Sequence, residues 1–328
     1  MNEQRGLLRE LIGDGRPALS LVAVALFASG AFAIFLSFRR EFLPHDVAFL
    51  GMTAADLCGF ADCRIVRFMF HDRVSFGGTL LAIATLYLWL AAFPLRQGAA
   101  WAWSAFLASG IIGFGSFLSF LGYGYLDSWH GAATIVLAAI FMVGLVVSRQ
   151  HATITATGWL RTPEGRRAPA RVRLGRYGLL ATGTGLTLAG LVILYLGSTE
   201  VFVAEDLGFM GLTRPVIDEI NPRLVPLIAH DRAGFGGGLA TVGVLLLVCA
   251  WHAPPSRAFH QAVLVSGGAG FGCALGTHIV EGYVNPVHLA PAIAGALLFA
   301  SSILLEMVAW RQSTVEPNPI IRRGVLSP

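Results

Sequence analysis

The amino-acid sequence predicts an all-α integral membrane protein with eight transmembrane helices, arranged as two tandem four-helix repeats of like orientation. Three observations predict this fold. Hydrophobic residues make up 55% of the 328 residues and charged residues only 13%, and the mean hydropathy is +0.68. Soluble domains carry about 25% charged residues. Apolar stretches of membrane-spanning length recur along the chain, and a set of polar motifs occurs twice.

Eight apolar windows are long enough to cross a bilayer. A transmembrane helix needs about 20 mainly apolar residues, because the hydrocarbon core is about 30 Å thick. The windows run over residues 17–38, 77–95, 99–121, 131–148, 178–197, 236–251, 262–280 and 287–310. We therefore expect four spans in each half of the chain.

The second half of the chain repeats polar motifs of the first half. The string HDRVSFGG at residues 71–78 corresponds to HDRAGFGG at 230–237, and GYLDSWH at 124–130 corresponds to GYVNPVH at 282–288. An even number of spans in each repeat gives both copies the same orientation in the membrane. The expected parts are a first repeat at 1–150, an arginine-rich linker at 151–176, a second repeat at 177–312 and a tail at 313–328.

Arginine sets the expected orientation, because the chain contains no lysine. Arginines cluster in the N-terminal segment, in the linker and in the C-terminal tail, and by the positive-inside rule these parts face the cytoplasm. The segments between the first two spans of each repeat hold most of the acids and face outward. We expect a protein of the bacterial inner membrane, in contact with the lipid bilayer, with both termini cytoplasmic. The net charge of +4 reflects this topology and indicates no nucleic-acid partner.

Each outward segment is expected to hold two short helices. Thr53 and Asp56 fit a capping box, and Thr213 followed by proline marks a helix start at the matching place. The segments 64–70 and 222–229 are apolar with scattered arginines, which is typical of amphipathic helices that rest on the bilayer surface or cap the bundle.

Cys58 and Cys63 lie five positions apart in the first outward segment. Outside the cytoplasm such a pair can oxidise, so we expect a structural disulfide or plain thiols. A redox or metal pair is the alternative that this spacing leaves open.

Histidines and carboxylates gather at one face of the predicted bundle. The HDR motif precedes the second span of its repeat and the GYxxxxH motif lies between the third and fourth, so we expect the two motifs of one repeat to meet. His278 and Glu281 share a helical face, and imidazole and carboxylate both suit Zn, Fe, Mn or Cu. The predicted metal ligands are His230, His278, Glu281 and His288 in the second repeat, with a lesser site at His71, Asp127 and His130 in the first.

Structural roles are the alternative for these residues. Asp127 and Asn285 precede helices and fit the N-cap position, and proline follows Asn285. Asp72 and Asp231 could cap the second and sixth spans. The histidines could be interfacial imidazoles bonded to a carboxylate, although ionisable groups near a membrane are costly and usually have a partner or a task.

Several common chemistries are excluded by missing motifs. The sequence contains no GxxxxGK[ST], GxSxG, HExxH or CxxCH, so ATP-driven transport and c-type haem attachment are not expected. A bis-histidine haem in mid-bilayer is disfavoured because the motif histidines lie at one surface, whereas a haem near the outer face stays open.

The strings HDRVSFGG and LGYGYLDSWHGAAT resemble those of a bacterial family of multi-pass integral membrane proteins, some of which are associated with dihydroorotate dehydrogenase. The resemblance covers most of the first repeat. The chain has no room for a flavin-binding barrel, so the resemblance implies no such activity here. It implies a membrane partner of quinone-linked redox chemistry.

Three functions follow as hypotheses. The first, which we favour, is a metal- or haem-dependent redox component with its site at the extracytoplasmic face, linked to a membrane redox partner or to quinone. The second is a transporter or channel for a small solute or proton, against which the scarcity of ionisable residues in the middle of the spans argues. The third is a non-catalytic scaffold whose motifs only cap and dock helices.

Overall fold

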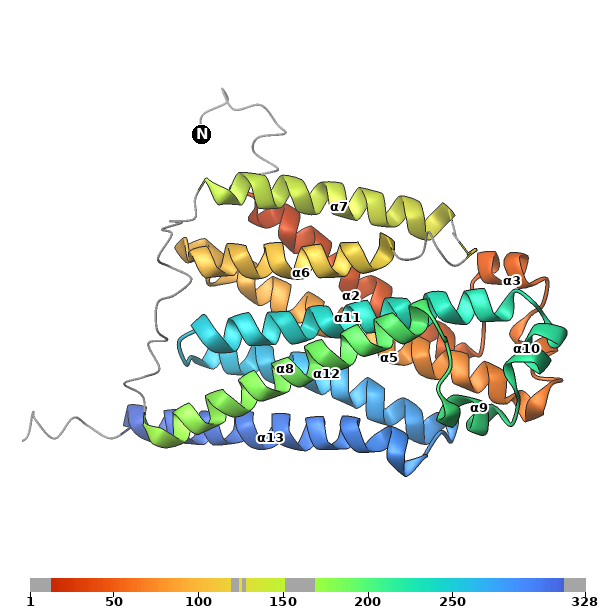
Figure 1. The fold of residues 1–328 in the computed structure, drawn as a ribbon. Coiled ribbons are helices and arrows are strands. Elements are labelled where there is room, and N and C mark those ends of the chain that lie inside the picture. The colour runs from red at the N-terminus through yellow and green to blue at the C-terminus, as the bar shows by residue number, and fades with distance from the viewer. Residues whose placement is uncertain (1–12, 119–123, 126–127, 151–168, 316–328) are drawn as a thin grey trace, which may run out of the picture.

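The computed structural model describes residues 13–118, 124–125, 128–150 and 169–315, and all regular structure in these ranges is helical. Among these residues, eight helices are long and apolar enough to cross a membrane. They lie side by side in one bundle (Figure 1), as the hydropathy windows predict. They are α2 Arg16–Arg39, α5 Arg64–Ala92, α6 Ala100–Leu118, α7 Ser128–Arg149, α8 Ala170–Ser198, α11 Leu224–His252, α12 Arg257–Glu281 and α13 Pro286–Val315.

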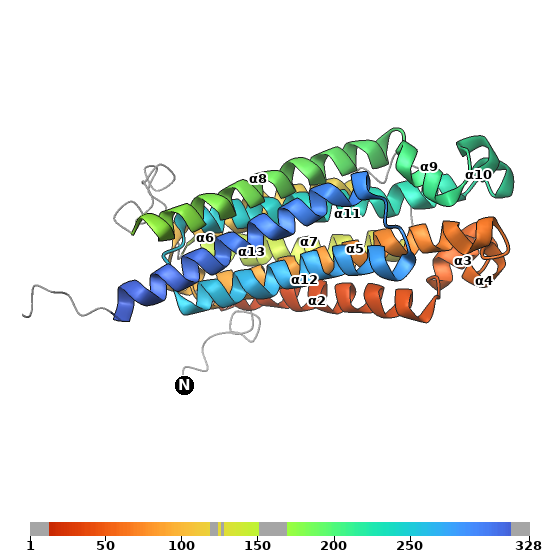
Figure 2. The same ribbon diagram turned by 90° about the horizontal axis from the view of Figure 1, so that it is seen from below.

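Short helices gather at one end of the bundle, called here the short-helix end (Figure 2). They are α3 Pro44–Leu50, α4 Ala54–Leu57, α9 Ala204–Met210 and α10 Arg214–Ile220. The predicted capping box starts α4, because the Thr53 hydroxyl accepts from the Asp56 backbone N–H and the Asp56 carboxylate accepts from the Thr53 backbone N–H. Cys58 and Cys63 form a disulfide in the same segment. Two 3-10 turns, Ala61–Cys63 and Leu95–Gln97, flank α5.

The helices α5 and α11 are longer than predicted. The segments 64–70 and 222–229, expected as separate surface helices, lead directly into these spans, and nearly all of their residues form the first turns of α5 and α11. The prediction was wrong because the short helices cover these turns, so their apolar residues are buried in the protein. Asp72 and Asp231 therefore lie inside helices and cap neither. The helix α8 begins at Ala170, within the range expected for the linker.

The centre of the bundle is formed by α5 and α11, the most deeply buried of the long helices. The helix α5 packs against α2 and α12, and α11 packs against α8 and α6. Glycines permit the closest approaches. A Cβ on Gly30 of α2 would lie 2.6 Å from the carbonyl oxygen of Gly77 of α5, and one on Gly190 of α8 would lie 2.6 Å from that of Gly236 of α11. Only glycine fits at these crossings.

Two clusters of buried apolar side chains divide the bundle along α5. One, at the short-helix end, includes residues 65–70 apart from Arg67, and the other includes much of 82–91. Buried polar side chains occupy the stretch of α5 between them; they belong to His71, Asp72, Ser75 and Thr79. Burying four polar groups in consecutive turns is costly unless they have partners, so this stretch is where a site is expected.

Candidate metal centre

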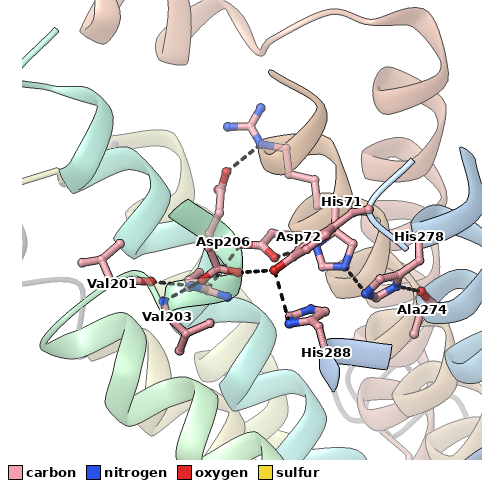
Figure 3. Close-up of polar contacts among 12 residues, drawn as sticks. His71, Asp72, Val201, Val203, Asp206, Ala274, His278 and His288 are labelled. Carbon is pink, nitrogen blue, oxygen red and sulfur yellow. Dashed lines mark hydrogen bonds and ion pairs between the residues drawn. The ribbon is translucent and has the colours of Figure 1, made fainter. Parts of the chain in front are cut away.

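Three histidines meet near the short-helix end of the bundle (Figure 3). His71 comes from α5, His278 from the last turns of α12 and His288 from the first turn of α13. One ring nitrogen of each lies within 4.8 Å of the other two. In the part of the chain that the structure describes, no other group of three or more histidine, cysteine or carboxylate side chains is arranged to hold a metal ion.

Hydrogen bonds determine which ring nitrogen of His71 and His278 carries the proton. Nδ1 of His71 lies 3.0 Å from a carboxylate oxygen of Asp72, and Nδ1 of His278 lies 2.6 Å from the carbonyl oxygen of Ala274. Both oxygens accept, so each Nδ1 donates and each Nε2 of a neutral ring keeps a lone pair. The two Nε2 atoms lie 3.0 Å apart. Two lone pairs therefore face each other, and a proton or a cation must separate them.

This arrangement matches what a metal ion requires of histidine ligands. Imidazole nitrogens that bind one ion at about 2.0–2.1 Å lie roughly 3.0–3.4 Å apart at ordinary bond angles. Metal-binding histidines also donate their other ring N–H to a carboxylate or a carbonyl, which fixes the tautomer. His71 and His278 meet both conditions.

The third histidine, His288, is held by Tyr283. The Tyr283 hydroxyl donates to the Asp206 carboxylate at 2.8 Å and lies 3.4 Å from Nδ1 of His288. Because the phenol donates its proton to Asp206, its oxygen accepts from Nδ1–H of His288, and Nε2 is left as the ligand atom. Burial, and then the charge of Asp206, raises the pKa of Tyr283 above its ordinary value. The phenol thus stays a donor.

Arg232 of α11 connects the partners of His71 and His288. Its guanidinium donates to the Asp206 carboxylate and to the carbonyl oxygen of Val201, and it lies 3.6 Å from the Asp72 carboxylate. Asp72, Asp206 and Arg232 are 1%, 0% and 6% exposed. Water therefore screens these charges little, and they hold the two histidines in place.

A second network repeats this pattern with the counterpart of each residue in the other repeat. Arg73 pairs with Asp46 and with Asp231 at 2.8 Å each, and the Tyr125 hydroxyl donates to Asp46 at 2.6 Å. Nδ1 of His230 lies 3.3 Å from Asp231. Arg73, Asp46 and Tyr125 correspond to Arg232, Asp206 and Tyr283 of the first network.

The histidines of the repeated motifs pair between the two halves of the chain. The rings of His71 and His288 lie 5.9 Å apart between centroids, and those of His230 and His130 lie 5.5 Å apart. We expected His71 beside residues 127–130 and His230 beside residues 285–288, and the structure corrects this for the histidines. The arginine of each HDR motif still shares an aspartate with the tyrosine of the second motif in its own repeat, as the prediction required. A shared membrane face does not decide which helix is the neighbour, and here α12 packs on α5 while α6 packs on α11.

The other predicted ligands lie elsewhere. Glu281 is buried but pairs at 2.6 Å with Arg40, the residue that follows the last turn of α2. His230 belongs to the second network. Asp127 lies outside the described residues. Asn285 caps α13 as the alternative interpretation predicted, because its side-chain oxygen accepts from two backbone N–H groups of the first turn.

Carboxylates outnumber guanidinium groups in the two networks. The carboxylates belong to Asp46, Asp72, Asp206 and Asp231, and the guanidinium groups to Arg73 and Arg232. With neutral histidines, each network holds one negative charge in excess. An uncompensated buried charge costs several kcal/mol, on the order of 3–5 when a buried pair is broken. A cation beside the histidines would offset that cost.

Four residues that bind the histidines or their partners were not among the site residues predicted from the sequence. They are Asp72, Asp206, Arg232 and Tyr283. The internal repeat held a signal for them, because each is identical to its counterpart in the other copy: Asp231, Asp46, Arg73 and Tyr125. Residues that two diverged copies both keep are candidates for one network.

Comparison of the chain with family models, with curated proteins and with solved structures found no match.

Proposed function

We propose that the protein is a metal-dependent redox component of the bacterial inner membrane, with one ion held by His71, His278 and His288 at the extracytoplasmic face. The observation that carries this proposal is the pair of Nε2 lone pairs 3.0 Å apart, each on a ring whose Nδ1 is already donating. A divalent cation between them removes their repulsion and offsets the excess negative charge of the surrounding carboxylates.

The ligand set favours a single transition-metal ion over haem. Three neutral imidazoles suit Zn, Cu, Fe or Mn. A porphyrin plane does not fit between two nitrogens that lie 3.0 Å apart. Three protein ligands leave coordination positions for a further molecule, as in catalytic metal sites. All three histidines line one cavity, which is the space where such a molecule would bind.

The membrane arrangement supports this assignment. We infer two tandem repeats of like orientation, because the matched helix order, the matched glycine crossings and the two matched networks follow the repeated motifs of the sequence. The arginines of the linker and the two terminal segments are assigned to the cytoplasm. The short-helix end, with the three histidines, then lies on the opposite side of the membrane. Apolar side chains exposed along the long helices are compatible with lipid contact.

Metal analysis with spectroscopy tests the proposal. The chain is purified in detergent without chelators, its metal content is measured, and optical and electron paramagnetic resonance spectra are recorded before and after reduction. We expect about one ion per chain and a spectrum that changes on reduction. His278→Ala should lower the metal content at least ten-fold. His252→Ala is the matched control, because His252 lies at the other end of the bundle, stacked on Trp101.

Each outcome separates one part of the proposal from another. Bound zinc with no change on reduction would retain the metal centre and reject the redox role. Wild-type protein that binds no metal, even after incubation with Zn²⁺, Mn²⁺, Fe²⁺ and Cu²⁺, would reject the metal centre. The hydrogen-bonded network with a protonated imidazole would then be the remaining account of the site.

A further inference from the structure

The three histidines stand at one end of a long cavity with apolar walls. The cavity has a volume of about 700 Å³ and lies between α5, α8, α11, α12 and α13. Most of its polar and charged lining gathers beside the histidines. Farther along α12 and α13 the walls are formed by apolar or small residues, among them Gly270, Phe271, Val263, Gly295 and Phe299. A molecule that fills this space has a polar head and an apolar body.

The cavity is longer than half of the hydrocarbon core. Its lining on α12 runs from Val263 to His278, fifteen positions along the helix, or roughly 22 Å at 1.5 Å per residue. Half of a hydrocarbon core about 30 Å thick is about 15 Å. A single extended lipid chain therefore fits along the cavity from the histidines.

The cavity opens sideways in the middle of the spans. Ala181 and Gly185 of α8, and Ala294 and Leu298 of α13, line the cavity and are also exposed at the surface. These positions lie within two helices that are apolar enough to cross a membrane. The opening then faces lipid, so the occupant comes from the bilayer.

Charge at the polar end restricts the head group. Asp72 and Glu205 line this end, and the guanidinium of Arg232 is already bound to Asp206 and close to Asp72. With a divalent ion at the histidines, the three acids of this end balance Arg232 and the ion. A carboxylate or phosphate head would then add a negative charge without a partner, which is unfavourable at low dielectric. A neutral hydroxyl or carbonyl oxygen meets no such repulsion.

We propose that the cavity binds a neutral, single-chain lipid whose head carries a hydroxyl or carbonyl oxygen beside His71, His278 and His288. The proposed metal centre gives the head oxygen its partner, and to that extent this inference rests on the proposed function. Isoprenoid quinones and long-chain alcohols share this chemistry. The mass of the bound molecule distinguishes them.

Two glycines of α12 provide a matched pair of variants. Gly270 lines the cavity, and the nearest atom to a Cβ built on it is the Cβ of Ala82 at 3.9 Å, so a leucine there extends into the cavity. Gly268 is two positions away, is exposed, and has no neighbour within 4 Å of its Cβ. Gly270→Leu should block the cavity, whereas Gly268→Leu makes the same change on the lipid-facing side. Ala292→Phe, on the α13 wall, is a second blocking variant.

The experiment measures bound lipid and metal in the same samples. Proteins purified in mild detergent and monodisperse on size exclusion are extracted with organic solvent, and the extracts are analysed by mass spectrometry. We expect about one neutral oxygen-headed lipid per wild-type chain, the same for Gly268→Leu, and at least a ten-fold loss for Gly270→Leu or Ala292→Phe. Added 1-hexadecanol should displace the bound lipid, and hexadecanoate at the same concentration should not.

The combined readout keeps the two proposals distinguishable. Lipid lost from the blocking variants while metal is retained supports the cavity assignment. Lipid bound to wild-type protein that holds no metal would reject the metal centre and leave the cavity assignment standing. Two results would overturn the inference even with metal present. One is that phospholipid is the only lipid found, in equal amounts in all variants. The other is that hexadecanoate displaces the bound lipid as effectively as hexadecanol.

Discussion

The Nε2 atoms of His71 and His278 lie 3.0 Å apart, although 207 positions separate the two residues in the chain. The contact joins α5 of the first half to α12 of the second. Nδ1 of His71 is tied to Asp72, on the same helix, and Asp72 lies beside Arg232 of α11. The three-histidine cluster therefore belongs to the complete bundle, and neither half of the chain contains it alone.

Asp72→Asn should weaken metal binding while leaving all three histidines in place. The carboxylate fixes the tautomer of His71, and loss of such an outer partner typically costs about 10–100-fold in metal affinity. Competition with a chelator of known affinity measures the change. Asp62→Asn is the control, because the Asp62 side chain is 91% exposed at the same end of the bundle. Equal affinities for the two variants would contradict the assignment of His71 as a ligand.

Tyr283→Phe should affect both stability and metal binding. The change removes a hydrogen bond to the buried Asp206 carboxylate and the acceptor for His288. An unsatisfied buried acceptor costs about 1–3 kcal/mol, so unfolding in detergent should need less denaturant, and metal affinity should fall. Tyr195→Phe, at a side chain 67% exposed, should change neither. If only stability fell, His288 would be removed from the ligand set.

Features that depend on local signals could be predicted from the sequence. The eight spans follow from hydropathy, because a run of about 20 apolar residues has few other uses. The start of α4 at Thr53 and the cap at Asn285 follow from side chains that bond to the adjacent helix. All three clustered histidines were predicted as ligands because they stood near one predicted surface, although His71 was assigned to a separate site in the first repeat.

Features that depend on helix packing could not be predicted. Glu281 was expected beside His278 because three positions bring residues to a similar helical face, but the two directions still differ by about 60°. Glu281 points to the C-terminal end of α2, where it pairs with Arg40. The partner of His71 depends on which helix packs against α5, and the sequence pattern of one repeat does not contain that information.

Glu306→Gln should destabilise the bundle without affecting the metal centre. Glu306 is fully buried in α13 and pairs with Arg176 of α8 at 2.5 Å. Removing one partner of a buried pair leaves an uncompensated charge and costs about 3–5 kcal/mol. Denaturant unfolding should show this loss, while metal content stays at the wild-type value. Glu41→Gln, at a side chain 51% exposed, is the control. A loss of metal in Glu306→Gln would mean that the two ends of the bundle are coupled.

Cysteine labelling should place the short-helix end outside the cell and the start of α8 in the cytoplasm. Glu219 on α10 and Arg171 on α8 are both exposed. The native cysteines give a low background, because Cys58 and Cys63 are joined, Cys249 is buried and Cys273 is half-buried. A membrane-impermeant maleimide should label Glu219→Cys in intact spheroplasts. It should label Arg171→Cys only after permeabilisation.

The reverse labelling pattern would show that the protein has the opposite orientation in the membrane. The three histidines would then face the cytoplasm, and the positive-inside argument from the arginines would fail for this chain. Labelling of both positions from the same side would instead contradict the bundle, since α8 runs from Arg171 to the end of the bundle that carries the short helices. The expected pattern requires both the orientation and an odd number of crossings between residues 171 and 219, which α8 provides.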